Sequence, residues 1–112
     1  MQIYALKPMA DNQKSYYGKA TVIINGDAII LKSYDTMVAA YDLEKKTFRR
    51  LWDGYSVTTM KHINSFIYAL HLIDYGTRSP FPADAHLQGG KKWWLSLEMY
   101  RDYPKTALYR DI

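Results

Sequence analysis

The distribution of apolar and polar residues in the first half of the chain predicts short β-strands. Two β-branched runs, residues 20–24 (ATVII) and 28–34 (AIILKSY), flank Asn25-Gly26-Asp27. An Asn-Gly pair between such runs is the strongest short-range signal for a β-hairpin, because its turn needs residues that tolerate positive φ. These runs therefore predict two antiparallel strands joined by a tight turn.

Three further runs extend this pattern. Residues 36–43 (TMVAAYDL) follow Asp35, and residues 47–52 (TFRRLW) follow a polar turn, although the alternation in the latter run is imperfect. Residues 2–6 form a short apolar run that ends at Lys7-Pro8 and is available as an additional edge strand. We therefore expect an antiparallel meander of three to five strands.

The period of the pattern changes after Asp53-Gly54. Three short hydroxyl side chains, Ser56, Thr58 and Thr59, are suited to accept hydrogen bonds from free N–H groups at a helix start. Apolar residues then recur at spacings of three, four and three, at Met60, Ile63, Ile67 and Leu70. This is one face of an α-helix. The pattern predicts a main helix over about residues 58–75, with Gly76 as its C′ residue, packed on one face of the sheet.

The C-terminal third is harder to interpret. Residues 76–90 contain two prolines and three glycines and predict a long loop. In residues 91–104 (KKWWLSLEMYRDYP), Trp93 and Leu97 share a helical spacing, whereas Leu97 and Met99 alternate as in a strand. We favour a helix closed by Pro104, with an extended segment as the alternative. The predicted fold is a single α+β domain.

Composition limits the function classes. The 112 residues contain no cysteine, which excludes disulfides, thiolate metal sites and thiol catalysis. No signal peptide and no membrane-length apolar run is expected, and the composition suits a cytoplasmic protein. The net charge is +4, with a calculated pI near 9.2, and each half of the chain contributes equally. A surface of this kind permits contact with nucleic acid and excludes mimicry of DNA by a polyanion.

No residue set in the sequence predicts catalysis, and we expect no metal, no cofactor and no enzymatic activity. On a helix, His62 and His71 would point in opposite directions, and His86 lies in the predicted loop without a third ligand nearby. His62 has serines close by, but no nucleophile motif surrounds it. We interpret His62 as structural, with its imidazole hydrogen-bonded to a neighbouring strand or loop. The run Gly89–Lys92 lacks a complete phosphate-binding loop.

Basic and aromatic residues are the candidates for partner contact. They occur as two groups in the sequence: Lys45, Lys46, Arg49 and Arg50, and then Lys91, Lys92, Trp93 and Trp94. Arginine beside exposed aromatic rings is typical of RNA-binding surfaces and of protein-binding hot spots. The alternative is that the charges are solvated and the tryptophans lie in the core. Adjacent tryptophans cannot both point inward, so at least one should be partly exposed or covered by a partner chain.

Three stretches also carry a family resemblance: residues 14–20 (KSYYGKA), 31–42 (LKSYDTMVAAYD) and 52–66 (WDGYSVTTMKHINSF). In this order they resemble small proteins carried by phages, plasmids and conjugative elements of Firmicutes. That family has no activity to carry over, and residues 77–112 have no counterpart in the pattern. Some similar mobile-element proteins are anti-CRISPR inhibitors of type II-A Cas9, so the resemblance implies a role of that kind here.

Two functions follow as expectations. The first is an inhibitor that binds a host effector, Cas9 or the Cas9–guide RNA complex, and interferes with guide loading or effector assembly. The second is a nucleic-acid-binding accessory protein of a mobile element, which contacts RNA or DNA through the basic groups. A homodimer is left open by the sequence.

Overall fold

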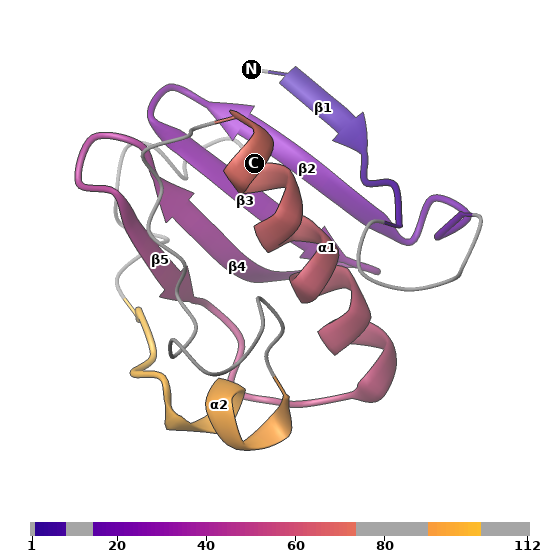
Figure 1. Ribbon diagram of the computed structural model, residues 1–112, viewed down its shortest axis with the longest axis vertical. Coiled ribbons are helices and arrows are strands. Elements are labelled where there is room, and N and C mark those ends of the chain that lie inside the picture. Colours follow the sequence, from indigo (N-terminus) through magenta and orange to yellow (C-terminus); the bar gives the residue numbers. More distant parts are fainter. Residues whose placement is uncertain (1, 9–14, 74–89, 102–112) are drawn as a thin grey trace.

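The computed structural model describes residues 2–8, 15–73 and 90–101, and the side chains of residues 71–73 are not considered. It shows a five-stranded antiparallel sheet in the order β1-β2-β3-β4-β5, with one long helix across one face (Figure 1). The elements are β1 (Gln2–Ala5), β2 (Ala20–Asn25), β3 (Ala28–Ser33), β4 (Thr36–Asp42), β5 (Thr47–Arg50), α1 (Val57–Ile73) and α2 (Lys91–Ser96). The predicted α+β meander with one main helix is confirmed.

Both hairpins of the β2–β3–β4 meander have two-residue loops. Asn25 pairs with Ala28, so the first loop is Gly26-Asp27, and Gly26 has a φ of 60°. A positive φ at the first loop residue alone is the pattern of a type II′ turn, which favours glycine there. The predicted hairpin is therefore present, but Asn25 belongs to the strand and not to the loop.

The second two-residue loop has a tyrosine where the first has glycine. Ser33 pairs with Thr36, and Tyr34 in the loop has a φ of 54°. Tyr17, before β2, and Lys46, between β4 and β5, have similarly positive φ values of 53° and 52°. A bulky side chain in this region of φ costs free energy, so the surrounding contacts must hold these residues in place.

Helix α1 begins where the hydroxyl pattern predicts. The Ser56 side chain accepts a hydrogen bond from the Thr59 N–H at 3.0 Å, and its carbonyl accepts one from the Met60 N–H at 2.9 Å. Ser56 is thus the N-cap, whereas Thr59 is buried and takes part in a side-chain cluster described below. The helix is described to Ile73; the predicted C′ residue Gly76 and the predicted loop 76–90 lie outside the described residues, apart from Gly90.

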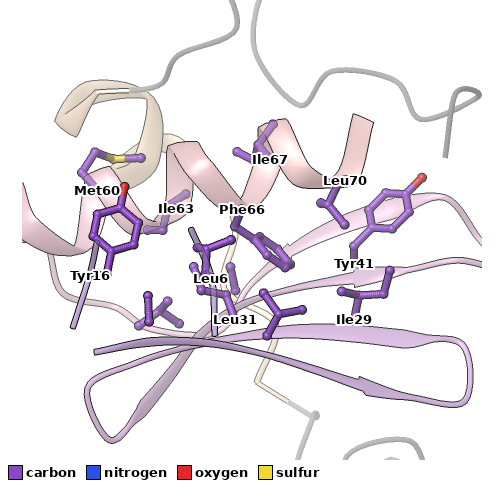
Figure 2. Packing of buried hydrophobic residues seen from close by; sticks show 14 of the residues in the cluster. Leu6, Tyr16, Ile29, Leu31, Tyr41, Met60, Ile63, Phe66, Ile67 and Leu70 are labelled. Atoms are coloured by element: carbon purple, nitrogen blue, oxygen red, sulfur yellow. The ribbon is translucent and has the colours of Figure 1, made fainter. Parts of the chain in front are cut away.

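The main core lies between α1 and the facing side of the sheet. The predicted helix stripe, which consists of Met60, Ile63, Ile67 and Leu70, is buried there together with Phe66. They form one cluster with residues of the sheet, and Figure 2 shows Phe66 and Leu70 on the side of the helix that faces Leu31 and Ile29 of β3 and Tyr41 of β4. Burial of this apolar surface is the main force that holds the helix on the sheet.

The other side of the sheet carries a second, smaller apolar cluster. It contains Ile23, Ala28, Ile30, Ala40 and Leu51, with Met37 and Tyr100 packed against it. Strand β3 therefore has buried residues on both faces, which explains its uninterrupted apolar run. At one edge of the sheet, in contrast, all four residues of β1 are exposed.

Among the described C-terminal residues, 90–101, only the first turns are helical. Helix α2 ends at Ser96, where Leu97 takes an extended conformation with φ −74° and ψ 140°. Met99 then forms an isolated parallel bridge with Arg50, and the Tyr100 N–H donates to the Arg50 carbonyl at 2.8 Å. The prediction that the helix continues beyond Ser96 is wrong for residues 97–101, because residues 97–100 gain hydrogen bonds and burial beside β5; Pro104 lies outside the described residues. Within residues 91–101, the helical interpretation holds for residues 91–96 and the extended one for residues 97–100.

Candidate functional site

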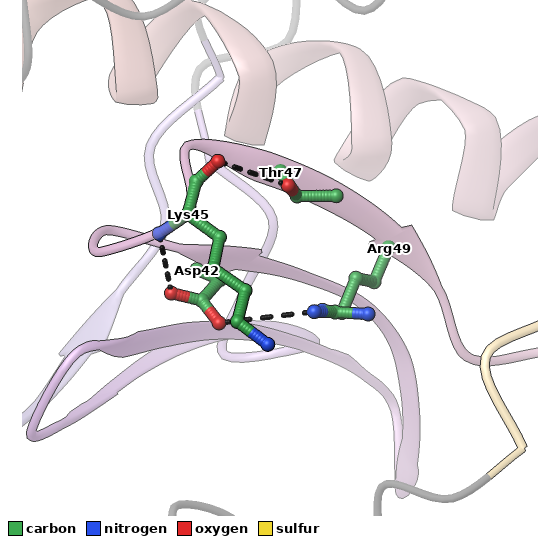
Figure 3. Close-up of polar contacts among 4 residues, drawn as sticks. All are labelled: Asp42, Lys45, Thr47 and Arg49. Atoms are coloured by element: carbon green, nitrogen blue, oxygen red, sulfur yellow. Dashed lines mark hydrogen bonds and ion pairs between the residues drawn. The ribbon is translucent and has the colours of Figure 1, made fainter.

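The first predicted basic group lies around the turn between β4 and β5. Asp42 organises this turn, because its carboxylate accepts a hydrogen bond from the Lys45 N–H at 3.0 Å and lies 3.8 Å from the Arg49 guanidinium (Figure 3). Lys45 and Lys46 are exposed, whereas the Arg49 side chain is mostly buried, with 17% of it exposed. Lys45 and Lys46 therefore lie on the surface of this turn, and Arg49 is held beside Asp42.

Arg50 is not part of this surface, which corrects the prediction for that residue. Its exposed fraction is 6%. The guanidinium donates to three backbone carbonyls: Nε to Trp52 at 2.9 Å, Nη1 to Leu97 at 3.0 Å and Nη2 to Asp53 at 2.9 Å. Burial lowers the Arg50 pKa, the charge of Asp53 opposes this effect and Arg101 adds to it. Arg50 therefore ties residues 97–101 to the end of β5.

The paired tryptophans are divided between core and surface, as their adjacency predicts. Trp94 is fully buried and donates its indole N–H to the Gly54 carbonyl at 2.7 Å, and the Arg50 guanidinium lies 5.1 Å from its ring. Trp93 is half-buried and packs beside Phe48. Trp94 is thus a core residue and not a contact residue, which corrects its assignment to the partner-binding set.

The two predicted basic groups do not form one patch. Lys45 and Lys46 lie at the start of β5, whereas α2 lies beyond its other end (Figure 1). Lys91 and Lys92 are exposed on α2, and the Lys91 ammonium lies 5.7 Å from the centre of the Tyr55 ring. The sequence shows which residues are basic, but only the folded structure shows that the two basic groups lie apart.

Between the two groups the structure contains a groove of about 720 Å³ that the sequence did not predict. One wall is β5 and the other is residues 97–101. Its cationic side chains are Arg49, Arg50 and Arg101, with Glu98 as the acidic member, and the Arg49 guanidinium stacks 4.0 Å from the centre of the Tyr100 ring. Guanidinium groups beside an aromatic ring can bind phosphate or carboxylate groups and stack on planar groups.

A second concentration of polar side chains surrounds His62 and is buried. The Ser33 hydroxyl lies 2.8 Å from His62 Nδ1 and 3.1 Å from the Thr59 hydroxyl. The Tyr16 hydroxyl lies 2.7 Å from the Ser65 hydroxyl, and the Tyr16 ring meets the His62 ring edge-on at 4.4 Å. We call these five residues the His62 cluster. The structural interpretation of His62 is confirmed, because its partner is on the neighbouring strand β3.

The His62 cluster resembles catalytic machinery only in its residue types. Ser33 and His62 form a close serine–histidine pair, but their exposed fractions are 2% and 1%, so no substrate can reach either group in this conformation. Within the described ranges, no three His, Cys, Asp or Glu residues come together as metal ligands. The cluster instead joins the loop before β2, the end of β3 and the start of α1.

The fold and these surfaces define a small α+β scaffold with a cationic groove and a buried polar cluster. The chain belongs to a family of unknown function, DUF8033, whose sequence model matches residues 4–79. This range contains the whole His62 cluster but ends before α2 and before the 97–101 wall of the groove. No curated protein and no solved structure matches the chain. Among the described helices, none has the length and apolar character needed to cross a membrane.

Two functional features could not be read from residue types alone. Arg101 is far from the Arg49–Arg50 pair in the sequence, and nothing in its local pattern marks it as a groove residue. For the contacts among Tyr16, Ser33 and His62 the sequence did hold a signal, because each of these residues lies in one of the three stretches on which the family resemblance rests. Those stretches are brought together by side-chain contacts in the folded chain.

Proposed function

We propose that this chain acts by binding another macromolecule and catalyses no reaction by itself. The arginine-lined groove carries this proposal, because it places Arg49 and Arg101 beside Tyr100 in a depression between β5 and residues 97–101. The polar group closest to a catalytic arrangement, the Ser33–His62 pair, is buried and serves the fold. The partner would carry anionic groups that complement the groove.

We propose further that the partner is a host defence effector, type II-A Cas9 or its complex with guide RNA. The family resemblance supports this target, and the net charge of +4 limits the mode of action. A basic chain would be repelled from the positive channel that holds the guide–target duplex, whereas it can compete for guide RNA before loading. The inhibitor would therefore act on guide loading or effector assembly in the cytoplasm of the host cell.

The test is a Cas9 cleavage assay with the protein added before or after guide RNA. We expect loss of cleavage when the protein is added first, and little effect on a complex that is already assembled. Arg101→Gln should weaken the inhibition. Gln2→Glu, on the exposed edge strand β1, makes the same change in net charge away from the groove and should not. Unchanged cleavage at a stoichiometric excess of the wild-type protein in both orders contradicts the Cas9 proposal.

A second candidate function is a nucleic-acid-binding accessory protein of a mobile element. The stacking of Arg49 on Tyr100 in an open groove favours it, because this combination binds nucleotide bases and phosphates together. Co-purification from a host lysate with and without nuclease separates the two functions. A partner retained after nuclease treatment supports the effector-binding function, and a partner lost with the nucleic acid supports this one.

A further inference from the structure

A second surface lies where β2 begins and β3 ends, away from the β5 groove. Two tyrosines project there: Tyr17 is 78% exposed and Tyr34 is 50% exposed. The Lys19 ammonium lies over the Tyr34 ring, 5.3 Å from its centre. We call Tyr17, Lys19 and Tyr34 the tyrosine platform. Neither exposed aromatic side chain contributes to the apolar core in the way that Tyr16 and Tyr41 do.

Hydrogen bonds from backbone N–H groups hold Tyr17 and Tyr34 in backbone conformations that are unfavourable for bulky side chains. Tyr17 and Tyr34 both have positive φ. The Tyr34 N–H donates to the Lys19 carbonyl at 2.7 Å, the Lys19 N–H donates to the Tyr16 carbonyl at 2.9 Å, and the Tyr17 N–H donates to the Ser15 hydroxyl at 2.9 Å. Strained backbone of this kind is concentrated at functional sites, where it presents a side chain in a set position.

Residues of the His62 cluster hold the chain directly before both platform tyrosines against α1. Ser33 directly precedes Tyr34, and its hydroxyl contacts His62 on α1. Tyr16 directly precedes Tyr17, and its hydroxyl contacts Ser65 on the same helix. The Tyr34 ring itself lies 6.0 Å from the His62 ring. Both exposed tyrosines therefore follow a residue that is hydrogen-bonded to one rigid helix.

The charges around the platform favour an anionic ligand. Three exposed lysines lie nearby: Lys7 after β1, Lys19 before β2 and Lys61 on α1. Asp35 is the exposed acid next to Tyr34. Leu6 bonds to Ala20, which places Lys7 beside the start of β2, and the Lys61 carbonyl accepts the Tyr16 hydroxyl. Proteins bind single-stranded nucleic acid through exposed aromatic rings that lie between lysines, because bases stack on the rings and the lysine ammonium groups bind the phosphates.

We propose that the tyrosine platform binds single-stranded nucleic acid by stacking bases on Tyr17 and Tyr34. This site goes beyond the proposed function, because it lies outside the groove and its test does not involve Cas9. The platform lies wholly within residues 4–79, the range matched by the family model, whereas one wall of the groove lies outside that range. Single-strand binding at the platform is thus a property that other members of the family could share.

The experiment is fluorescence anisotropy of labelled RNA and DNA oligonucleotides of about 12 nucleotides at about 50 mM salt. Tyr34→Gly is the main variant, because glycine is already used at the same position of the preceding hairpin and relieves the positive φ, so the fold is retained. Tyr17→Ala is the second variant. Tyr4→Ala is the matched control, because Tyr4 is also 50% exposed but lies on β1.

We expect wild-type binding that weakens with salt, and a loss of at least about five-fold in affinity for each platform variant. Tyr4→Ala should bind like the wild type. Preference for RNA or for DNA identifies the ligand, and either result supports the site. Absence of wild-type binding overturns the proposal, as do full affinity in the Tyr17→Ala/Tyr34→Gly double variant and an equal loss in Tyr4→Ala. Because no Cas9 is present, failure here leaves the cleavage test of the groove independent.

Discussion

Replacement of Arg50 by methionine tests whether one buried cation holds the C-terminal segment on the sheet. Methionine keeps much of the apolar volume of the side chain but removes all three hydrogen bonds to the carbonyls of Trp52, Asp53 and Leu97. It also removes the cation from the face of Trp94, 5.1 Å away. The loss should therefore affect both the junction before α1 and the segment after α2.

The magnitude follows from the number and kind of bonds lost. Hydrogen bonds to a charged group contribute about 1.5–3 kcal/mol each, so three would give about 4.5–9 kcal/mol if they were independent. They share one guanidinium, and water can replace part of what each carbonyl loses, so we expect Arg50→Met to lower the free energy of unfolding by about 3–5 kcal/mol. This is a large share of the total stability of about 5–15 kcal/mol that is typical of such domains.

The measurement is urea unfolding followed by circular dichroism and tryptophan fluorescence. Arg49→Met is the matched control: its ion pair with Asp42 is long, at 3.8 Å, and Asp42 keeps its hydrogen bond from the Lys45 N–H, so the substitution should cost only about 1–2 kcal/mol. If Arg50→Met does not fold, Arg50→Lys provides the same test, because one ammonium cannot reach three carbonyls and an intermediate loss is expected. A loss for Arg50→Met no larger than that for Arg49→Met refutes the reasoning.

Three further substitutions test single contacts by the same unfolding measurement. Ser56→Ala removes the N-cap of α1 and should cost about 1 kcal/mol, whereas Ser56→Asp should be tolerated; equal losses in both would contradict the capping role. Gly54→Ala should cost about 1–3 kcal/mol, because an added Cβ would lie 2.5 Å from the Trp52 ring, and an unchanged midpoint would show that the ring moves freely. Ser33→Ala should cost about 1–3 kcal/mol, because the buried His62 Nδ1 loses that hydroxyl, and a neutral result would mean that this bond does not stabilise the protein.

The local pattern determined the strands and the main helix, because β-branched runs, turn residues and a helical stripe are signals that each segment carries over its own length. The stripe from Met60 to Leu70 and the cap at Ser56 depend on residues within a few positions of each other, so sequence reasoning could find them. The same reasoning placed His62 correctly as a structural residue, since a polar group next to a helix start was expected to find a partner on a neighbouring strand or loop.

Residues of the candidate site were predicted less well, because whether a cation is exposed depends on contacts from distant parts of the chain. Arg49 and Arg50 are adjacent and chemically identical and both line the groove, yet Arg49 stacks on Tyr100 whereas Arg50 is buried and bonds to three backbone carbonyls. The same holds for Trp93 and Trp94: their adjacency indicated that at least one would be partly exposed, but not which.

The sequence by itself determined the class of fold, the basic character of the surface and the presence of a capped amphipathic helix, because these follow from composition and from short-range periodicity. Tertiary structure alone decided where the chemistry lies. It brought residues 97–101 beside β5 to make the groove, and it joined three distant stretches around His62 beneath the exposed tyrosines. The physical reason is that burial and hydrogen-bond satisfaction are properties of the whole packed chain, whereas periodicity is a property of each segment.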